Sequence, residues 1–132
     1  MASLEQPQRA TVLYVGNSRD NRAAIFRVVD RLGCGAATAC CYREALSWIN
    51  RNRFALVFCE QRLPDGRWLD LLSRFAEITE PPALVVLSQV RDSGSWAEAI
   101  NLGAQDVLLT PILDGELQHV AGSALHAWPL QS

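Results

Sequence analysis

The chain has 132 residues, of which 49% are hydrophobic and 20% charged, which suits one globular domain with a sizeable core. Its formal net charge of −2 gives no reason to expect direct contact with nucleic acid or with an anionic membrane surface. No apolar run approaches the roughly 18 residues needed to cross a bilayer. Residues 1–10 lack the apolar core of a signal peptide, so we expect a cytoplasmic protein.

Two residue types limit the possible chemistry. All 12 basic residues are arginine, which excludes a catalytic or phosphate-binding lysine. Without a secretory signal, the four cysteines are expected to be thiols and not a disulfide framework. The adjacent pair Cys40 and Cys41 leaves a redox-sensing role open, whereas their spacing and the distant His119 and His126 make a zinc site improbable.

The first part of the chain alternates strand and helix signals. Thr11–Val15 is β-branched and aromatic, and the segment that follows has apolar positions at helical spacing, after a possible cap at Ser18 or Asp20. Gly33 fits the position just after that helix. A weaker strand is predicted at 36–40, and a helix from Tyr42 to Asn52.

The middle of the chain holds its most informative stretch. Phe54–Cys59 is a short apolar run bounded by turn signals, which is typical of a buried strand in a parallel sheet. The run ends at Glu60, and Pro64-Asp65-Gly66 predicts a turn. Glu60 would therefore stand at the carboxyl end of a buried strand, where open α/β sheets form their ligand crevice.

The remainder continues the alternation. Leu69, Leu71, Leu72 and Phe75 mark a third helix, and Ala83–Leu87 is a strand that ends at Ser88. A fourth helix is expected to end at Leu102, before Gly103. The last elements are a short strand at Asp106–Leu109 and a helix from about Asp114 to Trp128.

Five strands alternating with five helices predict a doubly wound α/β domain with a five-stranded parallel sheet. We expect residues 1–10 to form an N-terminal tail, residues 11–128 the domain, and residues 129–132 a C-terminal tail or the start of a linker.

Several weak motifs occur in a specific order and spacing. They are Glu44-Ala45-Leu46, Leu63-Pro64 after the central strand, Ala99–Ala104 followed by Asp106, and Thr110-Pro111. On these motifs the chain resembles the receiver domain of two-component response regulators over almost its whole length. The resemblance implies a flavodoxin-like (βα)5 fold with strand order 2-1-3-4-5 and a crevice at the ends of strands one and three.

The resemblance also implies which positions form the site. In that family the central strand ends in the aspartate that accepts the phosphoryl group, and an acidic pair after strand one binds magnesium. Here those positions hold Glu60 and Gly16-Asn17.

Three further positions follow the same pattern. The family lysine at the end of strand five is replaced by Thr110, and its aromatic switch residue by Val107, while Ser88 keeps the hydroxyl. Since metal ligands, nucleophile and lysine are all altered, the resemblance indicates a degenerate pseudo-receiver that is not phosphorylated and whose magnesium binding is lost or weak.

The role of Glu60 has two interpretations. It could mimic the phosphorylated state and fix one output conformation. Alternatively, it could be a residual polar side chain, with expected partners among Asn17, Ser88, Thr110, Arg19 and Arg62. We favour the second, because a mimic works by engaging the lysine and hydroxyl that detect phosphate, and only the hydroxyl is kept.

Three tryptophans are candidates for an interface. Trp68 takes a position where the family commonly has glycine, and it could cover the degenerate pocket or form a contact surface, although tryptophan more often serves packing. Trp96 and Trp128 fall on the last two helices, where they could form an interface or a partly buried edge of the core. Tryptophan is enriched at binding hot spots, so these residues are possible contacts of a protein partner, or of a homodimer through helix 4, strand 5 and helix 5.

The predicted function is therefore a signalling module that binds a protein partner or a downstream effector domain. Two alternatives remain: a small-molecule sensor that uses the vacated crevice, and a phosphoacceptor that uses Asp65 or Asp70. The chain has no recognisable nucleophile–base set, and we expect no enzymatic activity of its own.

Overall fold

A computed structural model of the protein describes residues 10–89 and 93–127, and it forms three layers around one parallel sheet. The five strands of the sheet lie in the order β2-β1-β3-β6-β7. They are β1 (Thr11–Val15), β2 (Gly35–Ala39), β3 (Leu56–Glu60), β6 (Ala83–Ser88) and β7 (Asp106–Leu109). Counted within this sheet alone, the order is second, first, third, fourth and fifth. The doubly wound α/β fold is confirmed.

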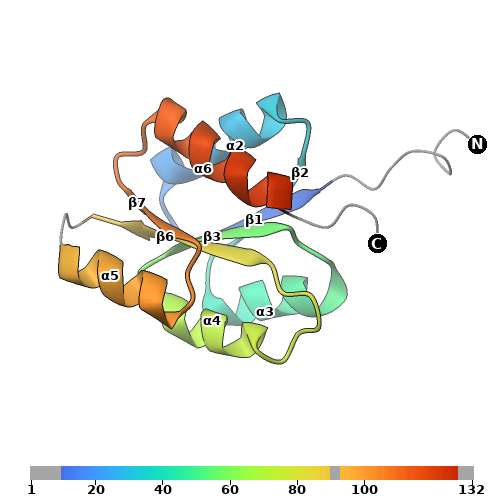
Figure 1. Cartoon of the computed structure of the whole chain (residues 1–132). Coiled ribbons are helices and arrows are strands. Elements are labelled where there is room, and N and C mark those ends of the chain that lie inside the picture. The colour runs from blue at the N-terminus through green and yellow to red at the C-terminus, as the bar shows by residue number, and fades with distance from the viewer. Residues whose placement is uncertain (1–9, 90–92, 128–132) are drawn as a thin grey trace, which may run out of the picture.

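Five helices cover the two faces of the sheet. They are α2 (Arg19–Arg31), α3 (Tyr42–Arg51), α4 (Trp68–Phe75), α5 (Ser93–Leu102) and α6 (Asp114–Ala127). Figure 1 shows α2 and α6 on one side of the sheet and α3, α4 and α5 on the other. Each face of a parallel sheet is thus buried, which explains why the central strands are apolar runs without alternation.

Local chemistry sets the ends of α2. The Ser18 hydroxyl accepts a hydrogen bond from the Asn21 N–H, so Ser18 is the N-cap. The helix ends before Gly33, whose φ of 74° is a conformation that side chains with a Cβ rarely adopt. Both features follow the prediction from sequence.

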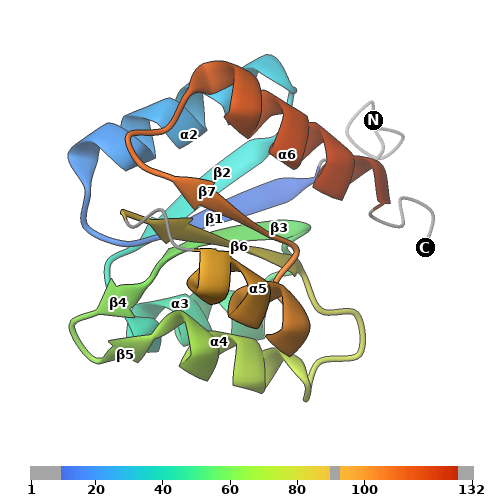
Figure 2. The same ribbon diagram turned by 60° about the vertical axis from the view of Figure 1, so that its left-hand side comes forward.

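A small hairpin between β3 and α4 was not expected. β4 (Arg62–Leu63) and β5 (Gly66–Arg67) pair antiparallel around the predicted Pro64–Asp65 turn. Figure 2 shows this hairpin beside α3 and α4. The hairpin brings Asp65 to the start of α3, a helix whose own N-cap residue forms no side-chain cap.

Two apolar clusters stabilise the layers. The first packs α2 and α6 against the sheet and includes Tyr14, Ile25, Phe58 and Leu117. The second lies beneath α3, α4 and α5. Four of the five side chains predicted to point inward from the last helix are buried: Leu117, Val120, Ala121 and Ala124. The fifth, Leu125, is partly buried against the first cluster.

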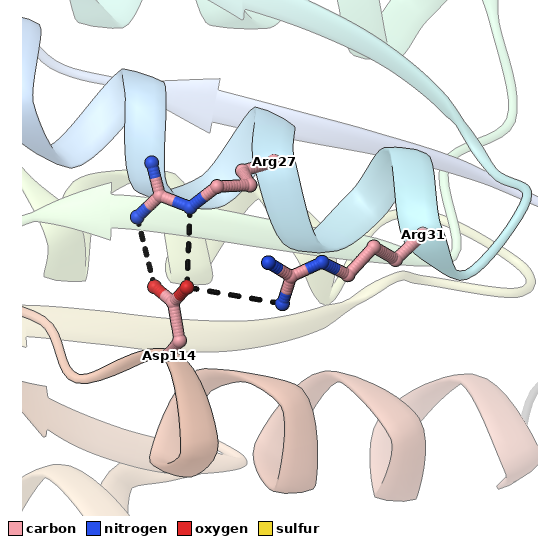
Figure 3. A network of polar contacts seen from close by, with 3 residues as sticks. All are labelled: Arg27, Arg31 and Asp114. Carbon is pink, nitrogen blue, oxygen red and sulfur yellow. Dashed lines mark hydrogen bonds and ion pairs between the residues drawn. The ribbon is translucent and has the colours of Figure 1, made fainter.

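An ion-pair network joins α2 to α6 at the surface. The Asp114 carboxylate accepts two hydrogen bonds from the Arg27 guanidinium, at 2.8 and 3.1 Å, and Arg31 approaches it to 3.8 Å. Figure 3 shows both arginines reaching from α2 toward the first residue of α6. The adjacent arginines hold the pKa of Asp114 below its usual range.

Element boundaries differ slightly from the predictions. The strand expected at 36–40 is Gly35–Ala39, and the central strand is Leu56–Glu60, although Phe54 is buried as well. Trp128, the N-terminal residues 1–9 and the expected tail at 129–132 lie outside the described residues. Within the described part, no helix is long and apolar enough to cross a membrane.

Candidate functional site

The candidate site lies where the strands of the main sheet end. Glu60 is the last residue of β3, Ser88 is the last of β6, and Gly16 and Asn17 directly follow β1. Thr110 directly follows β7. Because all five strands are parallel, their carboxyl ends lie at one edge of the sheet, and the fold brings these predicted residues to the same side.

The Glu60 carboxylate is held by two neutral donors. Its Oε2 accepts a hydrogen bond from the Tyr14 hydroxyl at 2.7 Å and another from Asn21 Nδ2 at 2.7 Å. Tyr14 belongs to β1 and Asn21 to the first turn of α2. The carboxylate therefore links three elements, and no ion pair to it is found among the described residues.

The partners expected for Glu60 from sequence are wrong. Within the described chain, Glu60 forms no ion pair or hydrogen bond with any of the five residues proposed as partners: Asn17, Ser88, Thr110, Arg19 and Arg62. The physical reason is the direction of the Glu60 side chain, which extends toward Tyr14 of β1 and Asn21 of α2.

Tyr14 is the centre of this cluster. It is 1% exposed, and its hydroxyl accepts a hydrogen bond from the Ser18 N–H at 3.0 Å while it donates to Glu60. Burial, and then the bond to Glu60, raise the pKa of Tyr14 above its usual value. The phenol thus stays protonated and remains a donor to the carboxylate.

Gly16 explains how the cluster fits. A Cβ at this position would lie 2.2 Å from Glu60 Cγ and 2.6 Å from the Tyr14 hydroxyl oxygen. Such distances are far inside van der Waals contact, so any larger residue at position 16 would displace Glu60 or Tyr14. The positions of Glu60 and Tyr14 therefore require a glycine at residue 16.

The other polar residues of the crevice bond elsewhere. Asn17 Nδ2 donates to the Cys40 carbonyl at 3.0 Å, and the Ser88 hydroxyl donates to Gln61 Oε1 at 3.2 Å. The Thr110 hydroxyl points to the Ser88 carbonyl at 3.5 Å. Ser88 is 3% exposed, so its hydroxyl is enclosed under the Gln61 side chain.

The tryptophans divide into different environments. Trp68 is only 5% exposed and packs in the cluster beneath α3, α4 and α5, so its interpretation as a contact surface is wrong. Its indole fills core space at the start of α4. Trp96 on α5 is 50% exposed, which leaves its interface role a prediction. Val107, at the position of the expected switch aromatic, is partly buried against the same cluster as Trp68.

The two aspartates considered as alternative acceptors are capping groups. The Asp65 carboxylate accepts hydrogen bonds from the N–H groups of Tyr42 and Arg43, at 2.7 and 3.1 Å. The first of these bonds is the main reason why the pKa of Asp65 lies below its usual value. Asp70 accepts from the Arg67 N–H at 2.8 Å and closes the start of α4.

Two of the four cysteines, Cys40 and Cys59, lie in settings that favour the thiol form. A side-chain interaction with Glu44 is the main cause that raises the pKa of Cys40, and burial raises the pKa of Cys59 well above its usual value. Both changes favour the thiol over the thiolate, the form that reacts with oxidants. Redox sensing gains no support from Cys40.

The sequence did not identify three residues of the site: Tyr14, Asn21 and Gln61. A tyrosine in a buried strand signals the need for a polar partner, because a buried hydroxyl is normally hydrogen-bonded. The sequence thus indicated that the Tyr14 hydroxyl needs a hydrogen-bond partner, but not which residue that partner is. Nothing in the sequence marked Asn21 as a site residue. It lies in the first turn of α2, and its bond to Glu60 depends on how α2 packs against the sheet.

The donor atoms at this edge are few. Among the described residues, no group of three or more His, Cys, Asp and Glu side chains converges on a possible metal position. Glu60 is the acid that ends β3, and the two positions after β1 contribute a glycine and an amide.

Comparisons with known proteins agree on one family. Residues 12–121 match the family "Response regulator receiver domain". The chain is 26% identical over 117 residues to the response regulator protein PilR of Pseudomonas aeruginosa, covering 89% of this chain and 26% of that protein. It therefore spans about a quarter of the length of this curated relative.

Solved structures show the same fold. The chemotaxis response regulator CheY4 of Vibrio cholerae superposes with a TM-score of 0.78 at 20% identity, with 89% of this chain and 100% of that chain covered. A two-component response regulator from Clostridium difficile gives a TM-score of 0.80 at 23% identity, with 90% and 98% covered. The family match over residues 12–121, together with this fold, places the chain in the response regulator receiver domain family.

Proposed function

We propose that this receiver domain acts in signal transduction by binding a protein partner, and that it is a pseudo-receiver without phosphotransfer at Glu60. The observation that carries the proposal is the filled crevice. Glu60 and the Tyr14 hydroxyl occupy the space above Gly16, and both are held by hydrogen bonds inside the protein.

The residues at this site lack most of the groups that phosphotransfer requires. The reaction needs a free carboxylate nucleophile, a metal ion held by carboxylates and a cation for the phosphoryl oxygens. One Glu60 oxygen is already bonded to Tyr14 and Asn21, and the chain has no lysine.

Magnesium does not fit the donor set. This ion dehydrates reluctantly and prefers carboxylate oxygens in near-octahedral geometry. Gly16 offers no side chain, and the Asn17 amide is bonded to the Cys40 carbonyl. We therefore propose no resident metal at this site.

The geometry argues against the two alternatives. A small-molecule sensor would need room near Gly16 and Trp68, but Glu60 and Tyr14 fill the first position and Trp68 is packed in the core. Asp65 and Asp70 each cap the start of a helix, so phosphorylation of either would break that cap.

Glu60 itself fits a structural role better than mimicry of phosphate. Its carboxylate is anchored toward α2 by Asn21 and Tyr14, whereas the hydroxyl of Ser88 is bonded to Gln61. A mimic would be expected to engage the hydroxyls at the ends of β6 and β7. We infer that Glu60 replaces a metal ion as the link between β1, β3 and α2.

A partner surface is best placed on the side of α5. Trp96, Leu102 and Leu113 are large apolar side chains that are at least 47% exposed on or next to the last two helices. Exposed tryptophan and leucine of this kind favour a protein contact, either a homodimer or an effector domain. The longer relative is consistent with a chain that works beside other domains.

The deciding experiment is incubation with magnesium and a small acyl phosphate, followed by intact mass spectrometry. We expect no phosphoryl adduct on the wild-type protein. Adduct formation on the wild type that is lost in Glu60→Gln would overturn the pseudo-receiver assignment, because it would identify Glu60 as an acceptor. An adduct that instead disappears in Asp65→Asn would place the chemistry in the hairpin.

Partner binding needs a separate test. Trp96→Ala should weaken self-association, or the binding of a purified full-length partner protein. The circular dichroism spectrum of the variant should equal that of the wild type. Unaltered association in Trp96→Ala would remove α5 from the proposed surface.

A further inference from the structure

The strand β2 lies at the edge of the sheet and lacks the usual protection of an edge. Its sequence is Gly-Ala-Ala-Thr-Ala, without a charge or a proline, and its pairing with β1 is regular from Gly35 to Ala39. Natural proteins commonly protect such edges with charges, prolines or bulges, because unpaired strand groups can bind another chain. Some other feature must keep this edge closed.

Hydrogen bonds show which groups of β2 face outward. The Gly35 N–H donates to Ala10, and the Ala39 carbonyl accepts from Gly16, so both residues face β1. In a parallel ladder alternate residues point the same way, and Ala36 and Thr38 therefore direct their N–H and C=O groups away from the sheet.

Two side chains of α3 close the second half of this edge. Trp48 Nε1 donates to the outward Thr38 carbonyl at 3.0 Å, and Glu44 Oε1 accepts from the Cys40 N–H at 2.7 Å. Residues 44 and 48 are separated by one helical turn, about 6 Å along the helix, and residues 38 and 40 by about 6.6 Å along the strand. Two side chains one helical turn apart on α3 thus bond to two successive outward groups along this edge.

The Trp48 side chain is fixed in this position. Its ring meets Phe54 edge to face, with centroids 6.2 Å apart, although the residue is 37% exposed. Trp48 bonds only to the carbonyl of Thr38. The other outward backbone groups of β2 are the N–H and C=O of Ala36 and the N–H of Thr38. In the part of the chain described, no side chain bonds to Ala36.

We propose that the outward edge of β2 is a latent surface for pairing with a second copy of this chain, and that Trp48 keeps it closed. An antiparallel pair centred on Ala36 is self-complementary. The Ala36 N–H of each copy donates to the Ala36 carbonyl of the other, as in any hydrogen-bonded pair of an antiparallel ladder. The small uncharged side chains of β2 present neither bulk nor like charge against this approach.

The test uses Trp48→Phe, which keeps an aromatic ring near Phe54 and removes the indole N–H. We expect the weight-average mass, measured by light scattering over a range of protein concentrations, to rise above that of the wild type at the same concentration. Ser47→Ala is the matched control, because this exposed residue lies beside Trp48 on α3 and takes no part in either proposed surface. Its mass should follow that of the wild type.

Ala36→Pro separates edge pairing from general loss of stability. Proline removes the outward N–H and is tolerated at an edge position whose N–H faces away from the sheet. We expect Ala36→Pro alone to fold and behave as the wild type, and the double variant Ala36→Pro, Trp48→Phe to return to the wild-type mass.

Either of two results would overturn the proposal. One is a folded Trp48→Phe variant whose mass equals that of the wild type at all concentrations. The other is association of Trp48→Phe that persists in the Ala36→Pro background. Hydrogen exchange gives a second measure, since the Ala36 amide should gain protection only in the associated Trp48→Phe protein.

Discussion

At the scale of single residues, the crevice is governed by three side chains that depend on one another. Glu60 needs donors because a carboxylate that loses water must be hydrogen-bonded or paired, and Tyr14 and Asn21 supply them. The Tyr14 hydroxyl and the Glu60 side chain need space, and Gly16 supplies it.

The hydroxyl of Tyr14 can be removed without changing the ring. Tyr14→Phe leaves the Glu60 carboxylate and the Ser18 N–H without this partner, and we expect a loss of about 2 kcal/mol in the free energy of unfolding. Urea denaturation measures it. Tyr42→Phe is the matched control, since no hydrogen bond of its hydroxyl is found in the described residues, and it should cost much less. Equal losses in the two variants would show that the Glu60 cluster contributes nothing.

Two glycines provide opposite tests of packing. Gly16→Ala places a methyl group against Glu60 and Tyr14 and should destabilise the protein by about 1–3 kcal/mol. Gly122→Ala, inside α6 and with no atom near the added methyl, should stabilise it by about 0.5–1 kcal/mol. Thermal and urea unfolding distinguish these signs.

The contact with Glu60 can be isolated in a double variant. If the Gly16 effect arises from Glu60, the loss in Gly16→Ala, Glu60→Ala should be smaller than the sum of the single losses. Additive losses would mean that backbone conformation, and not the side chain of Glu60, causes the sensitivity at position 16.

At the scale of elements, the β4–β5 hairpin holds α3 through Asp65. The first N–H groups of a helix lack partners within the helix, and the residue before α3, Cys41, forms no side-chain cap. The Asp65 carboxylate supplies that cap from a distant part of the chain. The hairpin thereby connects the crevice to the helix that also closes the edge of β2.

The Asp65 cap predicts a dependence of stability on pH. The folded-state pKa of Asp65 is lowered, so its contribution is fully present above the unfolded pKa of about 3.9 and is lost as the pH falls through the folded value. Asp65→Ala should therefore be less stable than the wild type at neutral pH, with the difference vanishing in strong acid. Glu98→Ala, an exposed acid on α5, should show no comparable difference. A deficit in Asp65→Ala that stays constant with pH would contradict the ionic cap.

At the scale of the whole molecule, the domain retains the receiver architecture while its crevice is filled from within. Both faces of the sheet have their own apolar cluster, and Arg27, Arg31 and Asp114 join the two helices on one face. Burial of apolar side chains on both sides of the sheet thus stabilises the fold.

The proposed absence of a resident metal ion predicts how the protein responds to magnesium. A ligand that binds only the folded state raises the melting temperature, by an amount set by its concentration relative to its Kd. We expect millimolar magnesium chloride to leave the melting temperature equal to that in sodium chloride of matched ionic strength. A rise specific to magnesium would show that the crevice holds the ion, and it would contradict the proposed replacement of metal by the Glu60 cluster.

Much of this protein follows from its sequence alone. Apolar runs that alternate with segments of helical periodicity specify the doubly wound sheet. The reason is that each helix must bury its apolar face against the sheet, and the apolar strands must be covered on both sides. Ser18 and Gly33 mark the ends of α2 through local backbone chemistry, and local signals are readable in sequence. The positions of Gly16, Asn17, Glu60 and Ser88 at one edge follow from the same alternation.

The partners of these residues were decided only by the tertiary structure. Glu60 bonds to Tyr14 and Asn21, 46 and 39 residues away, and Asp65 caps a helix that begins 23 residues earlier. The sequence left Trp68 open between packing and a contact surface, and the structure buries it in the cluster beneath α3, α4 and α5. Hydrogen bonds between distant residues depend on the direction of each side chain and on the packing of neighbouring layers, and neither leaves a periodic signal in the sequence.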